Sequence, residues 1–158
     1  AHLTLKVFKE KYKLFLVNGI LFNHESFKKD KEFLTSTIVK NAYKIKKGLK
    51  DNLILQSSYP VRDFAYAEDV VDAIYEIMTL KYPTDFIISG GNIFSVKMLA
   101  EKIFTKLNLD IKKILFKNKI KKNDIKIGDT SKIKKLKNWK PKYMGEKFLD
   151  KIIYEKQK

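Results

Sequence analysis

Apolar and polar residues occur along the chain in blocks that predict strands and helices in alternation. Residues 14–22 (LFLVNGILF) form an almost unbroken apolar run, which is typical of a strand buried on both faces of a parallel sheet. Residues 32–47 instead carry apolar side chains every three to four positions and stop at Gly48, which predicts an amphipathic helix. The polar stretch 23–31 between them is expected to be a loop.

The same alternation continues through the rest of the chain. Short strands are predicted at 53–56, 84–89 and 114–117, and Gly90 and Gly91 end the second of them. Helices are predicted at 67–80, with acidic residues in its first turn, and at 95–107, with Ser95 as its cap. Two shorter helices are expected near 130–137 and 145–156. The pattern therefore predicts an α/β protein with a parallel sheet.

The beginning of the chain has helical spacing without a helix start. Leu3 and Val7 stand four residues apart within residues 1–12, yet neither an initiator Met nor a capping residue precedes them. We expect the chain to begin inside a helix and to be the C-terminal part of a longer chain. Natural processing, or a boundary chosen for expression, would give the same pattern.

Composition narrows the class of protein. The 158 residues are 44% hydrophobic and 13% aromatic, which excludes the disordered class, and they include no cysteine, which excludes disulfides and cysteine metal sites. No run approaches the roughly 18 apolar residues of a membrane helix, and no signal-peptide pattern occurs. We expect a soluble, cytoplasmic protein without a membrane partner.

The charge of the chain is strongly positive. Basic residues outnumber acidic ones 34 to 18, a formal net charge of +16, which raises the question of an anionic partner such as nucleic acid. Arg62 is the single arginine, whereas proteins that recognise phosphates or bases usually rely on the planar guanidinium group. A general bias toward lysine explains the charge best, so nucleic acid is an unlikely partner.

Three segments in order resemble the GDP-mannose 4,6-dehydratase family, which belongs to the extended short-chain dehydrogenases. They are NGILFNHES (18–26), VRDFAYAEDVVDAIYEIM (61–78) and GDTSKIKKLKNWKP (128–141). The resemblance implies the C-terminal part of an extended Rossmann-type nucleotide-sugar dehydratase, with its last parallel strands and a small mixed α/β substrate-binding domain. Residues 1–23 and 61–90 would complete the Rossmann-type domain, and residues 24–60 and 91–158 would form the sugar-nucleotide-binding domain.

The resemblance also implies a chemistry. In this family NADP oxidises the sugar at C4, water is eliminated across C5 and C6, and the hydride returns at C6. The glycine-rich phosphate loop and the catalytic Tyr-x-x-x-Lys are expected upstream of Ala1, and this chain has no G-x-x-G-x-x-G. Tyr143 and Lys147 have the catalytic spacing, but Pro141 and Gly145 flank or interrupt the segment. The chain alone should therefore be inactive, and it would need an N-terminal Rossmann part from the same original chain or a separate one.

Six residues are candidate ligand contacts through this resemblance. His24 and Lys29 match positions that face NADP, and Asn23, Arg62 and either Lys119 or Lys121 match positions that bind GDP-mannose or a related GDP-sugar. Ordinary structural roles compete with these assignments. Asn23 could close an Asx turn, His24 could be a surface loop residue, and Arg62 could form an ion pair with Asp63 or Glu68.

Other conspicuous residues have structural interpretations. Trp139 is expected to pack the last helices, and the acidic series Asp69, Asp72 and Glu76 is expected to be an exposed helix face without a metal. Two other functions compete with the dehydratase-like one: a basic module that binds nucleic acid, and a non-catalytic remnant that serves as an assembly surface. The complete enzyme of this family is expected to be a homo-oligomer.

Overall fold

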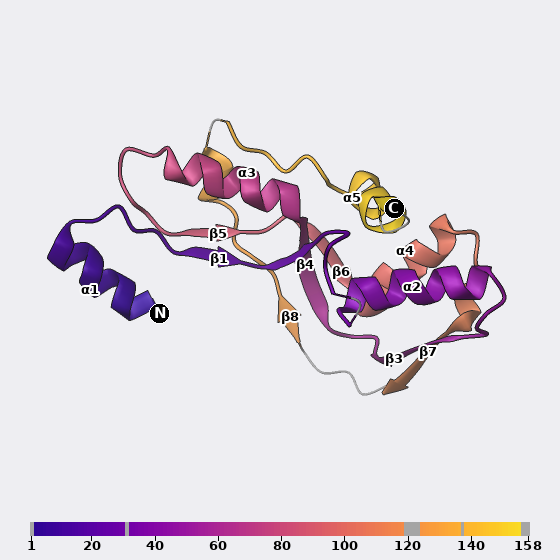
Figure 1. The fold of residues 1–158 in the computed structure, drawn as a ribbon. Helices are drawn as coiled ribbons and strands as arrows, with labels where there is room; N and C mark the ends of the chain where they lie inside the picture. Colours follow the sequence, from indigo (N-terminus) through magenta and orange to yellow (C-terminus); the bar gives the residue numbers. More distant parts are fainter. Residues whose placement is uncertain (1, 31, 119–123, 137, 156–158) are drawn as a thin grey trace.

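The computed structural model describes residues 2–30, 32–118, 124–136 and 138–155. Helices and strands alternate, as expected (Figure 1). In chain order the elements are α1 (His2–Tyr12), β1 (Gly19–Leu21), β2 (Asn23–Glu25), α2 (Leu34–Lys46), β3 (Leu53–Ser57), β4 (Val61–Tyr66), α3 (Ala67–Met78), β5 (Phe86–Ile88), β6 (Asn92–Ser95), α4 (Val96–Lys106), η1 (Ile111–Lys113), β7 (Ile114–Asn118), β8 (Ile125–Lys126), η2 (Ile133–Lys135) and α5 (Glu146–Tyr154).

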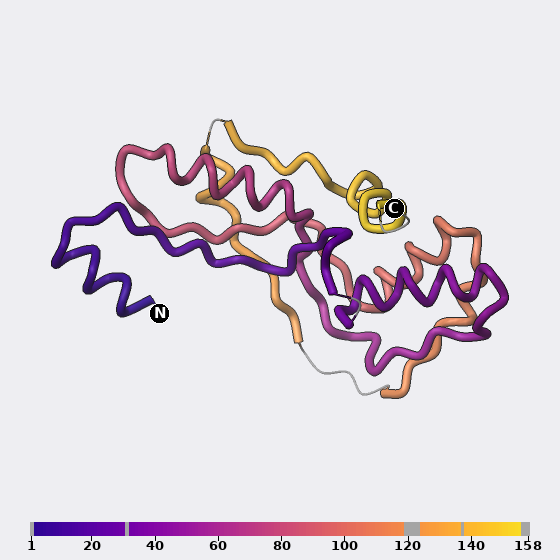
Figure 2. Tube along the Cα trace, viewed as in Figure 1, coloured from indigo at the N-terminus to yellow at the C-terminus, as the bar shows by residue number. Residues whose placement is uncertain are grey.

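The strands pair in three small groups. β1 pairs with β5 and β3 pairs with β7, both in parallel. The central group has the order β2–β4–β6, with β8 also paired to β4. Here β4 is parallel to β2 and β8 and antiparallel to β6, so the pairing is mixed, whereas the sequence predicted a parallel sheet. Figure 2 shows an elongated trace, with α1 at one end and the β3–β7 pair at the other.

The apolar run 14–22 differs from its prediction. Only residues 19–21 are in a strand, and all three are exposed, whereas the run was expected to be a strand buried on both faces. The amide of Phe22 donates the last hydrogen bond toward β5, to the carbonyl of Ile88 at 3.1 Å. The next three residues pair with β4 as β2, although a loop was expected there. The polar side chains of Asn23 and His24 conceal this strand from the apolar pattern.

Three further strands, β4, β6 and β8, were not predicted. β4 has the sequence VRDFAY, in which two adjacent charged residues interrupt the apolar alternation. Burial of Asp63 is possible because its carboxylate accepts the amide hydrogen of Gly91 at 2.8 Å. β6, which follows Gly91, pairs with β4 in antiparallel register from Val61 to Phe64. Long-range pairing, and not local pattern, makes these segments strands.

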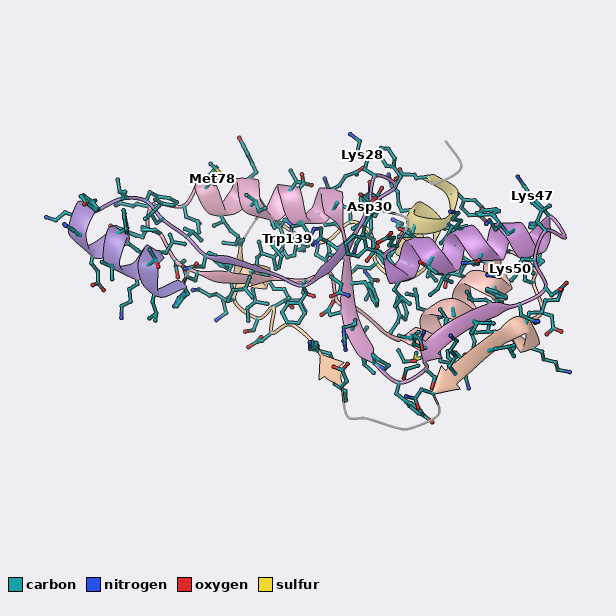
Figure 3. The ribbon with its side chains drawn as sticks, turned by 60° about the horizontal axis from the view of Figure 1, so that its bottom comes forward. Lys28, Asp30, Lys47, Lys50, Met78 and Trp139 are labelled. Atoms are coloured by element: carbon teal, nitrogen blue, oxygen red, sulfur yellow. The ribbon has the colours of Figure 1, made fainter. Side chains whose placement is uncertain are left out.

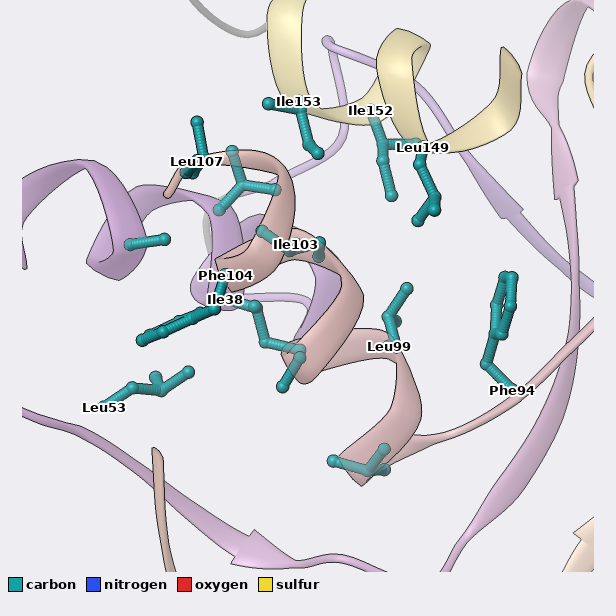
Figure 4. Packing of buried hydrophobic residues seen from close by; sticks show 14 of the residues in the cluster. Ile38, Leu53, Phe94, Leu99, Ile103, Phe104, Leu107, Leu149, Ile152 and Ile153 are labelled. Atoms are coloured by element: carbon teal, nitrogen blue, oxygen red, sulfur yellow. The ribbon is translucent and has the colours of Figure 1, made fainter. Parts of the chain in front are cut away.

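The buried side chains form two clusters. The larger one lies among α2, α4 and α5 and the strands beside them (Figure 4), and within it Phe64, Phe94 and Phe148 have ring centroids 6.3 to 6.4 Å apart. In the smaller one α3 packs on β5 together with Ile133 and Trp139. Burial of Trp139, at 3% exposure, confirms that this residue has a packing role. Its indole N–H donates to the carbonyl of Asp69 at 2.9 Å, and Figure 3 shows it beneath α3.

Several local signals are confirmed, and one helix is not. Gly48 follows α2 with a φ of +68°, and the hydroxyl of Ser95 accepts the amide hydrogen of Met98 to cap α4. The helix expected near 130–137 is only the 3-10 turn η2, because one turn suffices to bring Ile133 into the smaller cluster. The helix expected at 145–156 is present as α5.

The N-terminal end of the described chain has a large exposed apolar surface. No residue of α1 is buried, and Leu3 is 76% exposed. The following segment continues this surface with Leu14, Phe15, Ile20 and Leu21. In the described ranges β1 pairs with β5 alone, so its second edge carries no strand. No helix in the part of the chain that the structure describes is long and apolar enough to cross a membrane.

Candidate functional site

Two candidate ligand contacts, Asn23 and Arg62, come together with Lys126 on the strands β2, β4 and β8. Asn23 pairs with Phe64, and Arg62, two residues earlier on β4, pairs with Lys126 of β8. Strand spacing and rise place the Cα atoms of Asn23 and Arg62 about 8 Å apart. The side chains of Asn23 and Lys126 are exposed. The three strands can therefore present the amide of Asn23 and the cations of Arg62 and Lys126 to an anionic ligand.

Arg62 is braced on one side of its guanidinium group. Nη1 donates to the carbonyls of Val61 at 2.9 Å and of Asp124 at 3.0 Å, and Nη2 donates to Oδ2 of Asp124 at 2.6 Å. Of the five N–H donors, three are used in this way. Nε–H and the second Nη2–H have no acceptor among the described residues, and they lie side by side on one edge of the group. That edge has the geometry that binds two oxygens of an anion at once.

The partner of Arg62 corrects the competing interpretation of this residue. The sequence offered Asp63 or Glu68 as ion-pair partners, but the partner is Asp124, 62 residues away along the chain. Asp63 instead accepts from the amide of Gly91, and Glu68 accepts from the hydroxyl of Tyr143 at 2.5 Å. The hydrogen bond and charge of Arg62 lower the pKa of Asp124 below its ordinary value, so Asp124 is an anion at neutral pH.

The loop after β2 holds the two candidate cofactor contacts. His24 is exposed, and its Nδ1 lies 3.1 Å from the carbonyl oxygen of Phe22. Lys29 donates to the carbonyl of His24 at 3.0 Å and to Oε1 of Glu25 at 2.8 Å. Glu25 is 3% exposed, and its Oε2 has no hydrogen-bond partner among the described residues. The cation of Lys29 is therefore largely neutralised within the chain.

Sequence reasoning missed two residues of this site. Lys119 and Lys121, the candidates for a second nucleotide contact, lie outside the described residues. Asp124 and Lys126, just after them, were not considered. The paired strands give them their positions, since Val61 pairs with Ile125 and Arg62 with Lys126. The only signal in the sequence was the short alternation of polar and apolar residues at 124–127, which is too brief to predict a strand.

The acidic series on α3 also needs a correction. Asp69 was expected on an exposed face, but it is 1% exposed and accepts the amide hydrogens of Lys142 at 2.8 Å and Tyr143 at 3.1 Å. Burial raises the pKa of its carboxyl above the ordinary value, and these two hydrogen bonds oppose the rise. Asp72 does face outward and pairs with Lys142 at 2.5 Å. Within the described ranges no three His, Asp or Glu side chains are grouped to hold a metal ion.

The Tyr-x-x-x-Lys spacing occurs on α2 as well as near α5. Tyr143 precedes the first residue of α5, Glu146, and its hydroxyl is bound to Glu68, so it does not share a helix with Lys147. Sequence reasoning gave Tyr43 no Lys four residues on, which is wrong, because Lys47 stands at that spacing at the C-terminal end of α2. It follows the NHES segment, whereas the resemblance places the catalytic pair before it.

Comparisons with known proteins agree on one family. A family model described as GDP-mannose 4,6 dehydratase matches residues 1–152. GDP-mannose 4,6 dehydratase 1 of Arabidopsis thaliana is 32% identical over 161 residues, which cover 98% of this chain and 44% of the relative. The human GDP-mannose 4,6 dehydratase is 30% identical over 171 residues, which cover 93% of this chain and 45% of the relative. The chain thus spans less than half the length of these relatives.

Solved structures show the same α/β fold. The protein RMD of Pseudomonas aeruginosa, solved in complex with NADPH, aligns with a TM-score of 0.88 and 16% identity, over 99% of this chain and 53% of that one. The dTDP-glucose 4,6-dehydratase of Bacillus anthracis, solved with NAD, aligns with a TM-score of 0.81 and 23% identity, over 98% of this chain and 49% of that one. The fold is therefore that of about half of these extended dehydrogenase-like enzymes.

Proposed function

The chain belongs to the GDP-mannose 4,6-dehydratase family, and we propose that it is the C-terminal, sugar-nucleotide-binding portion of such an enzyme. In this proposal residues 1–23 and 61–90 complete a Rossmann-type domain, and residues 24–60 and 91–158 hold the GDP-sugar. The complete enzyme would convert GDP-mannose to GDP-4-dehydro-6-deoxymannose with NADP. Two observations support this placement. The three motifs occur in the order expected for the family, and the sequence has no glycine-rich phosphate loop, which in this family precedes them.

The free edge of the Arg62 guanidinium is the observation that carries the proposal. Asp124 holds the group in place and leaves Nε–H and one Nη2–H for a ligand, which is the arrangement that a diphosphate requires. Lys126 lies opposite on β8, and Asn23 is on the adjoining strand. A diphosphate placed there would receive two parallel hydrogen bonds and one further positive charge. The amide of Asn23 would be within reach of a sugar or phosphate oxygen.

The residues present fit NADP in part. His24 is exposed, and the contact of Nδ1 with the carbonyl of Phe22 leaves Nε2 on the outer side of the ring for a ligand. Lys29 fits less well, because its amine is already bound to Glu25 and to the carbonyl of His24. When bound, NADP supplies the oxidation and reduction of the sugar. The role of this chain would be to orient the cofactor, and His24 would provide the contact.

An N-terminal Rossmann part would cover the exposed apolar surface at α1 and β1. Leu3, Phe15 and Ile20 are 76%, 44% and 50% exposed, and β1 has one edge without a partner in the described ranges. A strand added to that edge would satisfy its backbone groups, and a neighbouring helix would bury the side chains. Because the relatives are about twice as long as this chain, they contain enough additional polypeptide to do this.

Binding of GDP to three variants tests the proposal. Isothermal titration of the chain with GDP should give measurable affinity, and Arg62→Ala should abolish it. Arg62→Lys keeps the charge but loses the paired donors, so we expect at least a tenfold loss of affinity. Lys112→Gln removes one exposed positive charge from η1 and serves as the matched control, with unchanged affinity. Equal GDP affinity in the wild type and Arg62→Ala would refute the proposal.

A further inference from the structure

A second basic site lies along the outer side of α2, away from the hydrogen bonds of Arg62. It is a groove of about 930 Å³ between α2 and the loop that follows β2. Its lining includes five lysines, namely Lys28, Lys29, Lys40, Lys46 and Lys47. Half of the ten lining residues that the structure describes are lysines, against about one residue in five along the whole chain. The lysine bias of the sequence therefore does not account for this concentration.

Four of these lysines are available to a ligand. Lys29 is held by Glu25, but Lys28, Lys40, Lys46 and Lys47 form no ion pair with any described residue, and all four are exposed. Among the described residues that line the groove, one is acidic, namely Asp30. Four uncompensated positive charges against one negative charge give the groove a positive potential, and its concave shape strengthens that potential for an anion that enters it.

The groove combines these charges with aromatic and buried surface. Its lining includes Ser36 and Val39, which are 2% and 1% exposed, and the aromatic residues Phe27 and Tyr43. Lys28 and Asp30 lie at one end of α2 and Lys47 at the other (Figure 3). Since α2 has 13 residues, the groove follows about 20 Å of helix. Its volume is at the upper end of the usual range for small-molecule sites.

We propose that this groove binds a nucleotide that carries several phosphates, at a site separate from the one built on Arg62. Lys40, Lys46 and Lys47 would hold the phosphate chain, because all three are exposed within about two turns at the C-terminal end of α2. The ring of Tyr43 or Phe27 would stack on the base. The site goes beyond the proposed sugar-nucleotide function, since neither Asn23 nor Arg62 lines it. Of the two proposed cofactor contacts, Lys29 lines the groove, but its amine is already bound to Glu25.

Titration of the 158-residue chain with ATP at about 50 mM salt tests this proposal. The double variant Lys40→Gln/Lys47→Gln should weaken ATP binding by at least tenfold, because each charge-assisted hydrogen bond to phosphate is worth about 1.4 kcal/mol or more. Lys44→Gln is the matched control, since Lys44 is an exposed lysine near the end of the same helix but does not line the groove. It should leave ATP affinity unchanged. Circular dichroism should show equal helix content in all variants.

Further measurements distinguish this site from the Arg62 site and distinguish a nucleotide from other anionic ligands. Arg62→Ala should abolish GDP binding but keep ATP binding; a variant that loses both would show that ATP binds at the Arg62 site. Tripolyphosphate should bind more weakly than ATP, and equal binding would refute a nucleotide as the ligand. A six-nucleotide single strand that binds more tightly than ATP through the same lysines would overturn the proposal in favour of nucleic acid. Equal losses of ATP affinity in the double variant and in Lys44→Gln would show that ATP binds through nonspecific charge attraction, and this would refute the proposal.

Discussion

Replacement of Asp69 should be the most damaging single change to the packing of the chain around α3. Its carboxylate is 1% exposed and accepts the amide hydrogens of Lys142 and Tyr143, which lie more than 70 residues further along the chain. The carbonyl of the same residue accepts the indole N–H of Trp139. Asp69 thus attaches the segment that leads to α5 to the first turn of α3.

The magnitude follows from the two amide groups that Asp69→Ala would leave without an acceptor. A hydrogen bond to a charged group contributes about 1.5 to 3 kcal/mol, and an unsatisfied amide that is partly buried costs about 1 to 3 kcal/mol. For two amides of intermediate burial we expect Asp69→Ala to lower the free energy of unfolding by about 3 kcal/mol. Asp69→Asn keeps one acceptor oxygen but turns an N–H₂ group toward the second amide, so we expect a loss of about 2 kcal/mol.

Urea unfolding followed by the fluorescence of Trp139 measures this effect where it arises, since Trp139 is the only tryptophan. With an m-value of about 2 kcal/mol/M, a loss of 3 kcal/mol lowers the midpoint by about 1.5 M. Asp72→Asn is the matched control: Asp72 is on the same helix but its ion pair with Lys142 is exposed, so the change should be below about 0.5 kcal/mol. The reasoning is refuted if Asp69→Ala and Asp72→Asn shift the midpoint equally.

Three further predictions concern the backbone, the core and the site. Gly90→Ala should lower the free energy of unfolding by about 2 to 3 kcal/mol in thermal denaturation, because the new Cβ would lie 2.4 Å from the carbonyl oxygen of Phe64. Gly19→Ala is the control and should be tolerated, since its Cβ would meet nothing closer than 3.6 Å. Equal losses of stability in the two variants would contradict this reasoning. Phe148→Ala should cost about 3 to 5 kcal/mol in urea unfolding, since the ring is 0% exposed within the larger cluster, and a loss below about 1 kcal/mol would show that the cluster is not closely packed. Because the bond from Arg62 lowers the pKa of Asp124, its stabilisation is present above about pH 4 and is lost as pH falls through the folded-state pKa. The stability difference between wild type and Asp124→Asn should therefore shrink between about pH 4 and pH 2 in urea titrations, and a difference that stays constant would show that the pair does not titrate.

The helices were predictable because each one carries its own pattern. α2, α3 and α4 bury one face each, and their apolar residues recur at the helical period, so a local reading of the sequence finds them. The glycine after α2 and the serine before α4 are likewise local signals, because a positive φ or a side-chain cap depends on residues only a few positions away. The family was recognisable for a similar reason, since its three motifs are short and contiguous.

The strands and the candidate site were less predictable. β4 is a strand because β2, β6 and β8 all pair with it, and three of its six residues are charged or have polar hydroxyls that hide the apolar alternation. The location of Arg62 as a candidate contact followed from the family resemblance and from its being the single arginine. Its actual partner, Asp124, could not be read from the sequence, which offered two nearer acidic residues with equal plausibility.

The sequence by itself thus determined the alternation of helices and strands, the positions of the main helices and the family. Only the tertiary structure decided which short strands pair, that Asp69 is buried while Asp72 is exposed, and which edge of the Arg62 guanidinium is free. The physical reason is the range of the interactions. A helix forms its hydrogen bonds within four residues, whereas Arg62 meets Asp124 and Asp69 meets Tyr143 across sequence separations of 62 and 74 residues, which only the folded chain brings together.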